Sequence, residues 1–450
     1  MKRAALLLLP LFSPLALAEF QFQPSVFLDG AWYGDSVHGE GNNMILNSPG
    51  LQNTHAHGGD EHDHAGGGHN HGTDVREGLN LRYAETTLYG LLPGVFDTRT
   101  NITFSPRAGE VSVEEFWFRS LGLPAGLQVK AGKFLSDIGY LNNQHPHQWD
   151  MADAPLAYQL LLGGALNQTG VQLNWTPPLP WYTRLGMEIS QGENSGYASV
   201  MGPATLHHEH EEEEQGEEEP AVQVPFDSRY NGARMVTAFV KIAPEIGDDH
   251  ALQLGAFWSR SRQHQELHEP HPGVNAALHG MQGSAWIAGA DVVYKYDAPQ
   301  AYGVGDLKIQ AEYIYQNKDL RLTYHELQPG LVGQPRELRQ DGFYVQAQYG
   351  ILPRFTLGAR YDMTGLTHEA LRAGATRGPT TPSYFEDMKR VTAALTWHIT
   401  ETQKLRFQVA RTNAPVGVDD GAAGRVERQS FNQYYIQYQI GFGAHAAHGF

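Results

Sequence analysis

The sequence predicts an all-β fold, a transmembrane antiparallel β-barrel of about 16 strands, and three observations lead to it. Apolar and polar residues alternate along segment after segment, as in strands with one apolar and one polar face. Short turns alternate with long polar connections, which is the arrangement of bacterial outer-membrane barrels. After residue 18 no apolar run approaches the ~18 residues that a membrane-spanning helix needs. A helical membrane protein is therefore excluded.

Residues 1–18 have the pattern of a secretory signal peptide. Lys2 and Arg3 precede an apolar run, and small residues at positions 16 and 18 mark a cleavage site. We expect the barrel to comprise residues 19–450 after cleavage. A cleaved signal followed by a barrel predicts a multi-pass protein of the outer membrane of a Gram-negative bacterium.

Strand alternation is clearest in LKIQAEYIY (307–315), where apolar residues occupy the odd positions. Segments of this kind begin near residues 20, 77, 94, 109, 127, 168, 181, 230, 250, 284, 306, 338, 354, 387, 402 and 430. A large soluble all-β protein would alternate too. Against it stand the absence of a linker and the aromatic residues at strand ends, expected at the membrane interface: Trp32, Tyr33, Trp175, Trp181 and Tyr182.

The long connections should all lie on one side of the membrane. If the first strand runs outward, residues 34–76, 136–167 and 193–229 form the first, third and fourth outer loops. Most of the 22 histidines then fall outside. Among them we expect His264, His268 and His279 in the fifth connection and His325 and His368 in the sixth and seventh.

The first of these loops contains three His-x-His pairs between glycines and acids, His55/His57, His62/His64 and His69/His71. Neutral imidazole is the commonest protein ligand for zinc, copper and nickel. Glycine spacers would let two pairs close on one ion, at the cost of ordering the loop, so binding should be weak and quickly exchanging. We therefore predict zinc capture here, with Cu²⁺ or Ni²⁺ as alternatives. A low-complexity spacer without metal is the competing interpretation.

The fourth loop reads HHEHEEEEQGEEE from residue 207. An acidic run alone is usually a solvated tract. Because His207, His208 and His210 adjoin it, a patch that concentrates cations is an equally good interpretation.

A family resemblance is carried by EEFWFRSLGLPAGLQVKAGKFLSDIG (114–139), which resembles a strand–turn–strand of the phosphate-selective (O/P-type) porins. With NNQHPHQWDMADAPLAYQ (142–159) and the His-rich first loop, the chain more closely resembles zinc-regulated outer-membrane proteins related to those porins. The motif-like match covers about 55 residues. Terminal Phe450 resembles the residue that the outer-membrane assembly machinery reads in that class.

The third loop is not low-complexity, and LAYQLLLGG after Asp153-Ala154-Pro155 predicts a short helix capped by that aspartate and proline. In porins of this type the third loop folds into the lumen. The resemblance therefore implies a constriction near His145, His147, Asp150 and Asp153, with the two histidines as metal ligands. An ordinary loop packed on the wall is the alternative. Basic residues expected on the wall, among them Arg360, Arg390 and Arg406, would favour anions.

Together these features predict a porin-like outer-membrane channel that captures transition-metal ions, zinc foremost, and passes them to the periplasm. An anion or general solute porin without metal specificity and a surface metal-binding protein with a blocked lumen remain alternatives. The expected partners are membrane lipid, metal ions and the assembly machinery; a homotrimer is one candidate assembly, and the sequence does not fix the oligomeric state. The formal net charge of −17 disfavours nucleic acid. The sequence has no G-x-S-x-G, H-E-x-x-H or P-loop motif, so we expect no enzyme.

Overall fold

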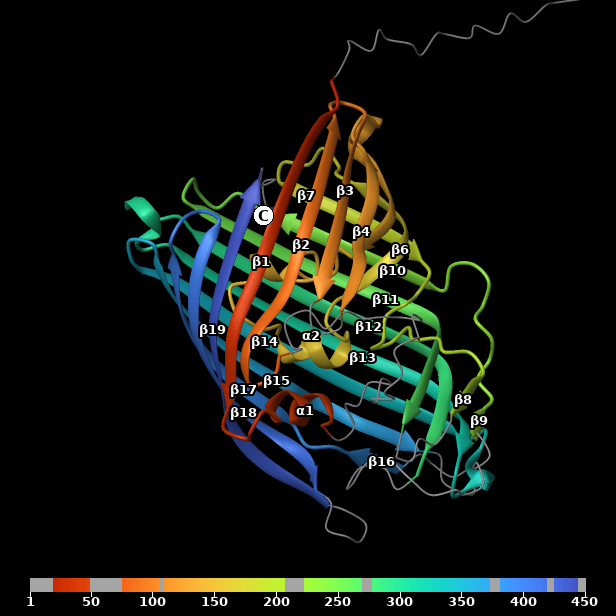
Figure 1. Ribbon diagram of the computed structural model, residues 1–450. Coiled ribbons are helices and arrows are strands. Elements are labelled where there is room, and N and C mark those ends of the chain that lie inside the picture. The colour runs from red at the N-terminus through yellow and green to blue at the C-terminus, as the bar shows by residue number, and fades with distance from the viewer. Residues whose placement is uncertain are drawn as a thin grey trace, which may run out of the picture.

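The computed structural model describes residues 19–48, 75–105, 109–206, 222–268, 277–372, 381–418 and 425–443 (Figure 1). Within them, sixteen antiparallel strands each pair with the next, and the last strand pairs with the first to close a barrel. The predicted fold class is thus confirmed. The expected signal peptide, the His-x-His pairs of the first loop, the histidines at 207–210 and Phe450 lie outside the described residues.

The barrel strands are β1 (Gln21–Asp35), β2 (Gly78–Leu92), β3 (Phe96–Ser105), β4 (Glu110–Ser120), β5 (Leu127–Leu135), β6 (Asn167–Trp175), β7 (Tyr182–Ser190), β10 (Met235–Ala243), β11 (His250–His268), β12 (His279–Tyr296), β13 (Leu307–His325), β14 (Pro335–Leu352), β15 (Phe355–Arg372), β17 (Met388–His398), β18 (Gln403–Val418) and β19 (Arg425–Gly443). Short β16 (Thr381–Tyr384) also pairs with β15, and β8 (Ala204–Leu206) pairs with β9 (Val222–Val224) in a separate sheet. The helices are α1 (Gly41–Leu46) and α2 (Leu156–Leu161), with 3-10 turns at Pro124–Gly126, Pro146–Gln148, Ala301–Gly303 and Pro329–Leu331. None of the described helices is both long and apolar enough to span a membrane.

Alternation along each strand separates a lipid-facing surface from the lumen. On β7, Leu185, Met187 and Ile189 are exposed, whereas Glu188 and Ser190, at alternate positions, are buried. The outward face is therefore apolar, as a surrounding bilayer requires.

The prediction that Tyr33 lies at the membrane interface is wrong. Trp32 is exposed on the outside, but its neighbour Tyr33 is fully buried and donates its hydroxyl hydrogen to Asp35 at 2.8 Å. Successive side chains of a strand point to opposite faces, so the two rings cannot share the outer surface.

Several strands are longer than a membrane requires. β11 and β13 have 19 residues each, whereas about 9–11 tilted residues cross the hydrocarbon core. The end of the barrel that carries the long connections, hereafter the loop end, is therefore built from strand extensions. For this reason five histidines expected in loops lie on strands instead: His264, His268, His279, His325 and His368.

Candidate functional site

The connection between β5 and β6, residues 136–166 and hereafter loop 3, lies inside the barrel (Figure 1). Its helix α2 contacts β13, β14 and β15. All six α2 residues are buried, and Leu156, Leu160 and Leu161 belong to the largest apolar cluster of the described residues, together with wall side chains such as Phe239 and Ile314. The lumen thus contains a packed core of its own.

Polar contacts fasten loop 3 to the wall on several sides. The carboxylate of Glu312 on β13 accepts hydrogen bonds from the backbone N–H groups of Tyr140 and Leu141, at 3.1 and 2.9 Å. The Tyr158 hydroxyl donates to the same carboxylate at 2.7 Å. Because Glu312 is buried, these donors supply the hydrogen bonds that its desolvated oxygens need.

The basic wall residues seen in the sequence bind the acidic side of loop 3. Asp153 contacts Arg390 at 2.7 Å and Arg360 at 3.0 Å. Asp150 contacts Lys308 at 2.7 Å, and Arg406 donates to the backbone oxygen of Trp149 at 2.8 Å. Asp153 therefore does not cap α2 as predicted; the residue before the helix is Pro155, with no side-chain cap, because the two guanidinium groups engage the carboxylate.

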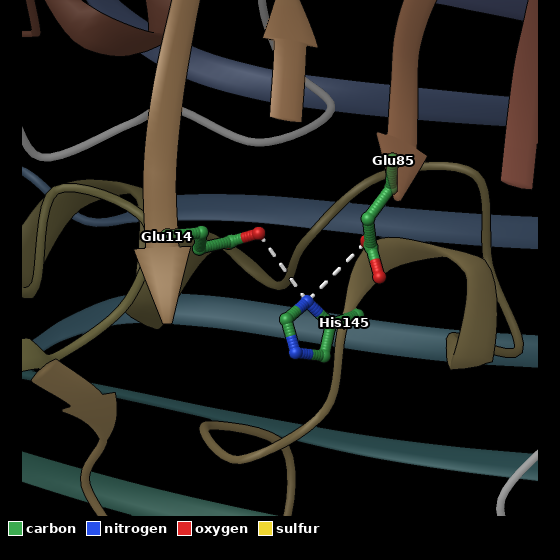
Figure 2. Close-up of side chains that lie close together, drawn as sticks. All are labelled: Glu85, Glu114 and His145. Atoms are coloured by element: carbon green, nitrogen blue, oxygen red, sulfur yellow. Dashed lines mark ion pairs between the residues drawn. The ribbon is translucent and has the colours of Figure 1, made fainter. Parts of the chain in front are cut away.

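His145 of loop 3 lies among carboxylates from two strands (Figure 2). Its Nδ1 is 3.4 Å from Oε2 of Glu85 on β2 and 3.3 Å from Oε2 of Glu114 on β4. Its Nε2 is 2.9 Å from Oε2 of Glu115. Glu85, Glu114 and His145 are all buried, and one ligand atom of each lies within 4.8 Å of the other two. This set could hold a metal ion.

A β-bulge explains how two successive glutamates reach the same histidine. Asn101 pairs with Glu115 and the next residue of β3, Ile102, pairs with Val113, so Glu114 is the extra residue of β4. A bulge bends the strand and redirects side chains. Both carboxylates consequently point into the lumen, where regular alternation would place one outside.

Burial alone would lower the pKa of His145, but the carboxylates of Glu85 and Glu114 outweigh burial and raise that pKa well above its usual value. The carboxylates thus favour the positively charged form of His145, whose charge would partly neutralise the cluster. His147 differs, since burial lowers its pKa and Glu85 opposes this only in part. Metal and proton compete for the same imidazole nitrogen. A divalent cation that binds His145 would therefore displace the proton from that nitrogen.

His147 links this cluster to a cavity of 730 Å³. Its ring stacks on Phe27, with centroids 4.0 Å apart, and lies 5.8 Å from the ring of His145. The cavity lies between loop 3 and the short turn at 400–402, hence toward the turn end of the barrel. One acidic residue, Glu401, lines it beside six basic ones: Arg99, Arg184, Lys241, Lys295, Lys308 and Lys404. Arg99, Arg184 and Lys308 pair with Glu115, Asp137 and Asp150, so the excess positive charge of this basic chamber, which favours anions, rests on the other three.

Of the residues predicted as metal ligands, the structure brings His145 and His147 together and places them against the wall. Their role as ligands stays a prediction, as does that of the nine histidines outside the described ranges. Sequence reasoning missed Glu85, Glu114 and Glu115. The signal for two of them was present, because a pair of adjacent acids interrupts the aromatic strand VEEFWF.

No protein-family model matches the chain. An uncharacterised protein of Aquifex aeolicus is 30% identical over 390 residues, which is 86% of this chain and 73% of that protein. Among solved structures, the trimer form of in-vitro folded OmpT, an outer membrane protein of Vibrio cholerae, has a TM-score of 0.50 and 10% identity, covering 94% of this chain and 99% of that one. The anion-selective porin from Comamonas acidovorans has a TM-score of 0.49 and 9% identity, covering 94% and 100%. The similarity to Vibrio OmpT shows that the two proteins share the fold of outer-membrane barrels.

Proposed function

The chain belongs to the same family as the uncharacterised Aquifex protein. From its barrel and the lumenal cluster, we propose that it is a porin-like outer-membrane channel. In this proposal the channel captures transition-metal ions, zinc foremost, and passes them to the periplasm. The single observation that carries this proposal is the Glu85–Glu114–His145 cluster. Kinship with the zinc-regulated relatives of phosphate-selective porins is part of the proposal and rests on residues 114–159.

The cluster has the donor types and spacing that zinc accepts. Zinc binds carboxylate oxygen and imidazole nitrogen at about 2.0–2.2 Å in a tetrahedron, which places the ligand atoms about 3.3 Å apart. The distances from His145 Nδ1 to the two glutamate oxygens are 3.4 and 3.3 Å. His147 Nδ1, 3.5 Å from the same Glu85 oxygen, is the nearest further ring nitrogen. Small movements would therefore complete the site.

The path that we propose has three stages. Outer histidines at 55–71 and 207–210 collect ions weakly, the cluster at loop 3 selects them, and His147 passes them toward the chamber at the turn end. Lipid contacts the apolar outer face, Phe450 serves the assembly machinery, and a homotrimer is the proposed oligomer, as in the trimer form of Vibrio OmpT. Neither a catalytic activity nor a nucleic-acid partner is part of the proposal.

Two other functions each have an observation in their favour. The basic chamber favours an anion or general solute porin. The packed core of loop 3 favours a surface metal-binding protein whose lumen is blocked.

Zinc flux into liposomes that contain the purified barrel and an enclosed zinc-sensitive dye separates these functions. We expect the Glu85→Gln/Glu114→Gln variant to lower zinc influx by about tenfold or more, since even outer-shell changes typically cost that much affinity. Glu427→Gln, which alters an exposed pair with Arg425, is the matched control and should leave influx unchanged. Equal influx in the cluster variant would contradict the selecting role. Chloride current without zinc influx would favour the anion porin. Zinc binding without any flux would favour the surface metal-binding protein with a blocked lumen.

A further inference from the structure

A ladder of histidines crosses three neighbouring strands at the loop end of the barrel. In the strand register His268 of β11 lies opposite His279 of β12, which lies opposite His325 of β13. The rings of His268 and His279 are 5.0 Å apart between centroids and nearly parallel, at 12°. Those of His279 and His325 are 5.8 Å apart at 23°. All three residues are half-buried, so ions in solution can reach them.

Hydrogen bonds fix which nitrogen of each ring carries the lone pair. Nε2 of His268 donates to Oε2 of Glu266 at 2.8 Å, which leaves the lone pair of the neutral ring on Nδ1. Nδ1 of His279 donates to the backbone oxygen of Ala277 at 3.1 Å, which leaves the lone pair on Nε2. A ring N–H donated to a carboxylate or carbonyl is the usual arrangement of metal-ligating histidines.

Glu266 is held in place for this role. It is buried, and its other oxygen, Oε1, contacts Lys318 at 2.6 Å and His264 at 2.8 Å. These contacts keep the carboxylate ionised and aim Oε2 at His268. Glu266 therefore acts as a positioning residue rather than as a ligand.

We propose that His268 and His279 form a metal site at the loop end, in which Nδ1 of His268 and Nε2 of His279 bind one borderline divalent cation such as Zn²⁺, Ni²⁺ or Cu²⁺. Side chains directly opposite on antiparallel strands have Cβ atoms about 4.5–5.5 Å apart. In the structure the two rings are nearly parallel, so their in-plane lone pairs do not yet meet, and metal binding requires the rings to rotate about their side-chain bonds until Nδ1 of His268 and Nε2 of His279 face one ion. Water fills the remaining positions, so the ion exchanges readily. The site adds to the proposed function but does not depend on it, because binding here requires no transport.

His325 provides an internal comparison. Its Nδ1 accepts the backbone N–H of Gln328 at 3.3 Å, so the lone pair of the neutral ring is occupied and Nε2 carries the hydrogen. His325 therefore stacks on the ladder without acting as a ligand. A substitution there removes an imidazole of similar burial and position but not a metal–nitrogen bond.

The test uses the full-length barrel in which the outer histidines are serine, so that they do not mask the site: His55, His57, His62, His64, His69, His71, His207, His208 and His210. Zn²⁺ is titrated by calorimetry and Cu²⁺ coordination is read by electron paramagnetic resonance. Further adding His268→Gln/His279→Gln should remove one bound Zn²⁺ per barrel and the signal of two imidazole nitrogens. Adding His325→Gln instead should preserve both. Adding Glu266→Gln should weaken zinc binding by about tenfold or more without removing the site.

Unchanged stoichiometry in the His268→Gln/His279→Gln barrel would overturn the proposed site, and equal loss in the His325→Gln barrel would overturn the choice of ligands. The proposed function is tested separately by zinc influx in the cluster variant, whose outcome does not alter this stoichiometry.

Discussion

At the scale of single residues, Asp153 anchors loop 3 to the wall through three buried partners. Its carboxylate contacts Arg390 at 2.7 Å, Arg360 at 3.0 Å and Gln408 at 2.8 Å, all of them buried. Removing one partner of a buried ion pair typically costs about 3–5 kcal/mol, because the remaining charge is desolvated without compensation. We expect Asp153→Asn to lower the free energy of unfolding by this order, measured by urea titration in detergent micelles.

Asp387→Asn is the matched control for that change. Asp387 pairs with Arg428 at 2.8 Å, but both side chains are partly exposed. Exposed pairs contribute about 0–1 kcal/mol. Equal losses in the two variants would mean that the Asp153 network does not stabilise the protein.

The same aspartate predicts how loop 3 responds to acid. Burial would raise the pKa of Asp153, but Arg390 and Arg360 outweigh it and hold that pKa below its usual value. A carboxyl group whose pKa is depressed by folding stabilises the protein above its unfolded pKa of about 3.9 and loses this contribution as the pH falls through the folded pKa. We expect the protection of the amides of residues 136–166, relative to their intrinsic exchange rates at each pH, to stay constant from pH 7 to 5 and to fall only below about pH 4. A loss of protection already between pH 7 and 5 would contradict this assignment.

Of the candidate cluster, only His145 could be predicted from the sequence, together with its neighbour His147. His145 and His147 stand out because two histidines flank a proline in a structured loop. Their carboxylate partners come from β2 and β4, which the chain brings to loop 3 only when the barrel closes. Glu114 was further hidden by the bulge, because strict alternation would direct one of two adjacent glutamates into lipid.

At the scale of elements, the strands were predictable wherever lipid contacts one face, since alternation is then strict. The prediction failed at the loop end. There β11 reads QHQELH (263–268) and both faces are polar or covered, so the sequence no longer distinguishes strand from loop. Helix α1 was not predicted either; its six residues contact β18 and β19, and contacts with distant strands leave no local periodic signal.

Loop 3 behaves as an element whose apolar packing is separate from the strand ladder. Leu161 is fully buried against this core. Truncating a buried leucine typically costs about 2–5 kcal/mol, through lost burial and the cavity that remains. We expect Leu161→Ala to expose loop 3 to limited proteolysis while the barrel keeps its resistance to heat and detergent, because no strand hydrogen bond is removed.

Leu366→Ala is the control for this packing effect, since Leu366 on β15 is 61% exposed. Its digestion pattern should match that of the wild type. If the Leu161→Ala barrel also resists digestion, loop 3 is held by its polar anchors alone.

At the scale of the whole molecule, the lumen contains two neighbouring regions of opposite charge. The acidic cluster at His145 adjoins the basic chamber through His147, whose ring faces both. A divalent cation that leaves the cluster along the proposed path therefore crosses an electrostatic barrier in the chamber, which slows its release, whereas a small anion is attracted. The chamber should determine the selectivity between the ions of simple salts. The cluster should determine the selectivity for ions that coordinate imidazole.

This arrangement predicts chloride over potassium selectivity for the purified barrel, read as the reversal potential across a KCl gradient in a planar bilayer. Lys295→Gln should bring the permeability ratio closer to one, since Lys295 lines the chamber. Lys389→Gln, at an exposed pair with Asp387, should have no effect. The preference should weaken between 0.1 and 1 M salt, because the screening length falls from about 10 to about 3 Å. Cation selectivity at low salt would show that the acidic cluster governs all ions, and the basic residues would then act only as anchors of loop 3.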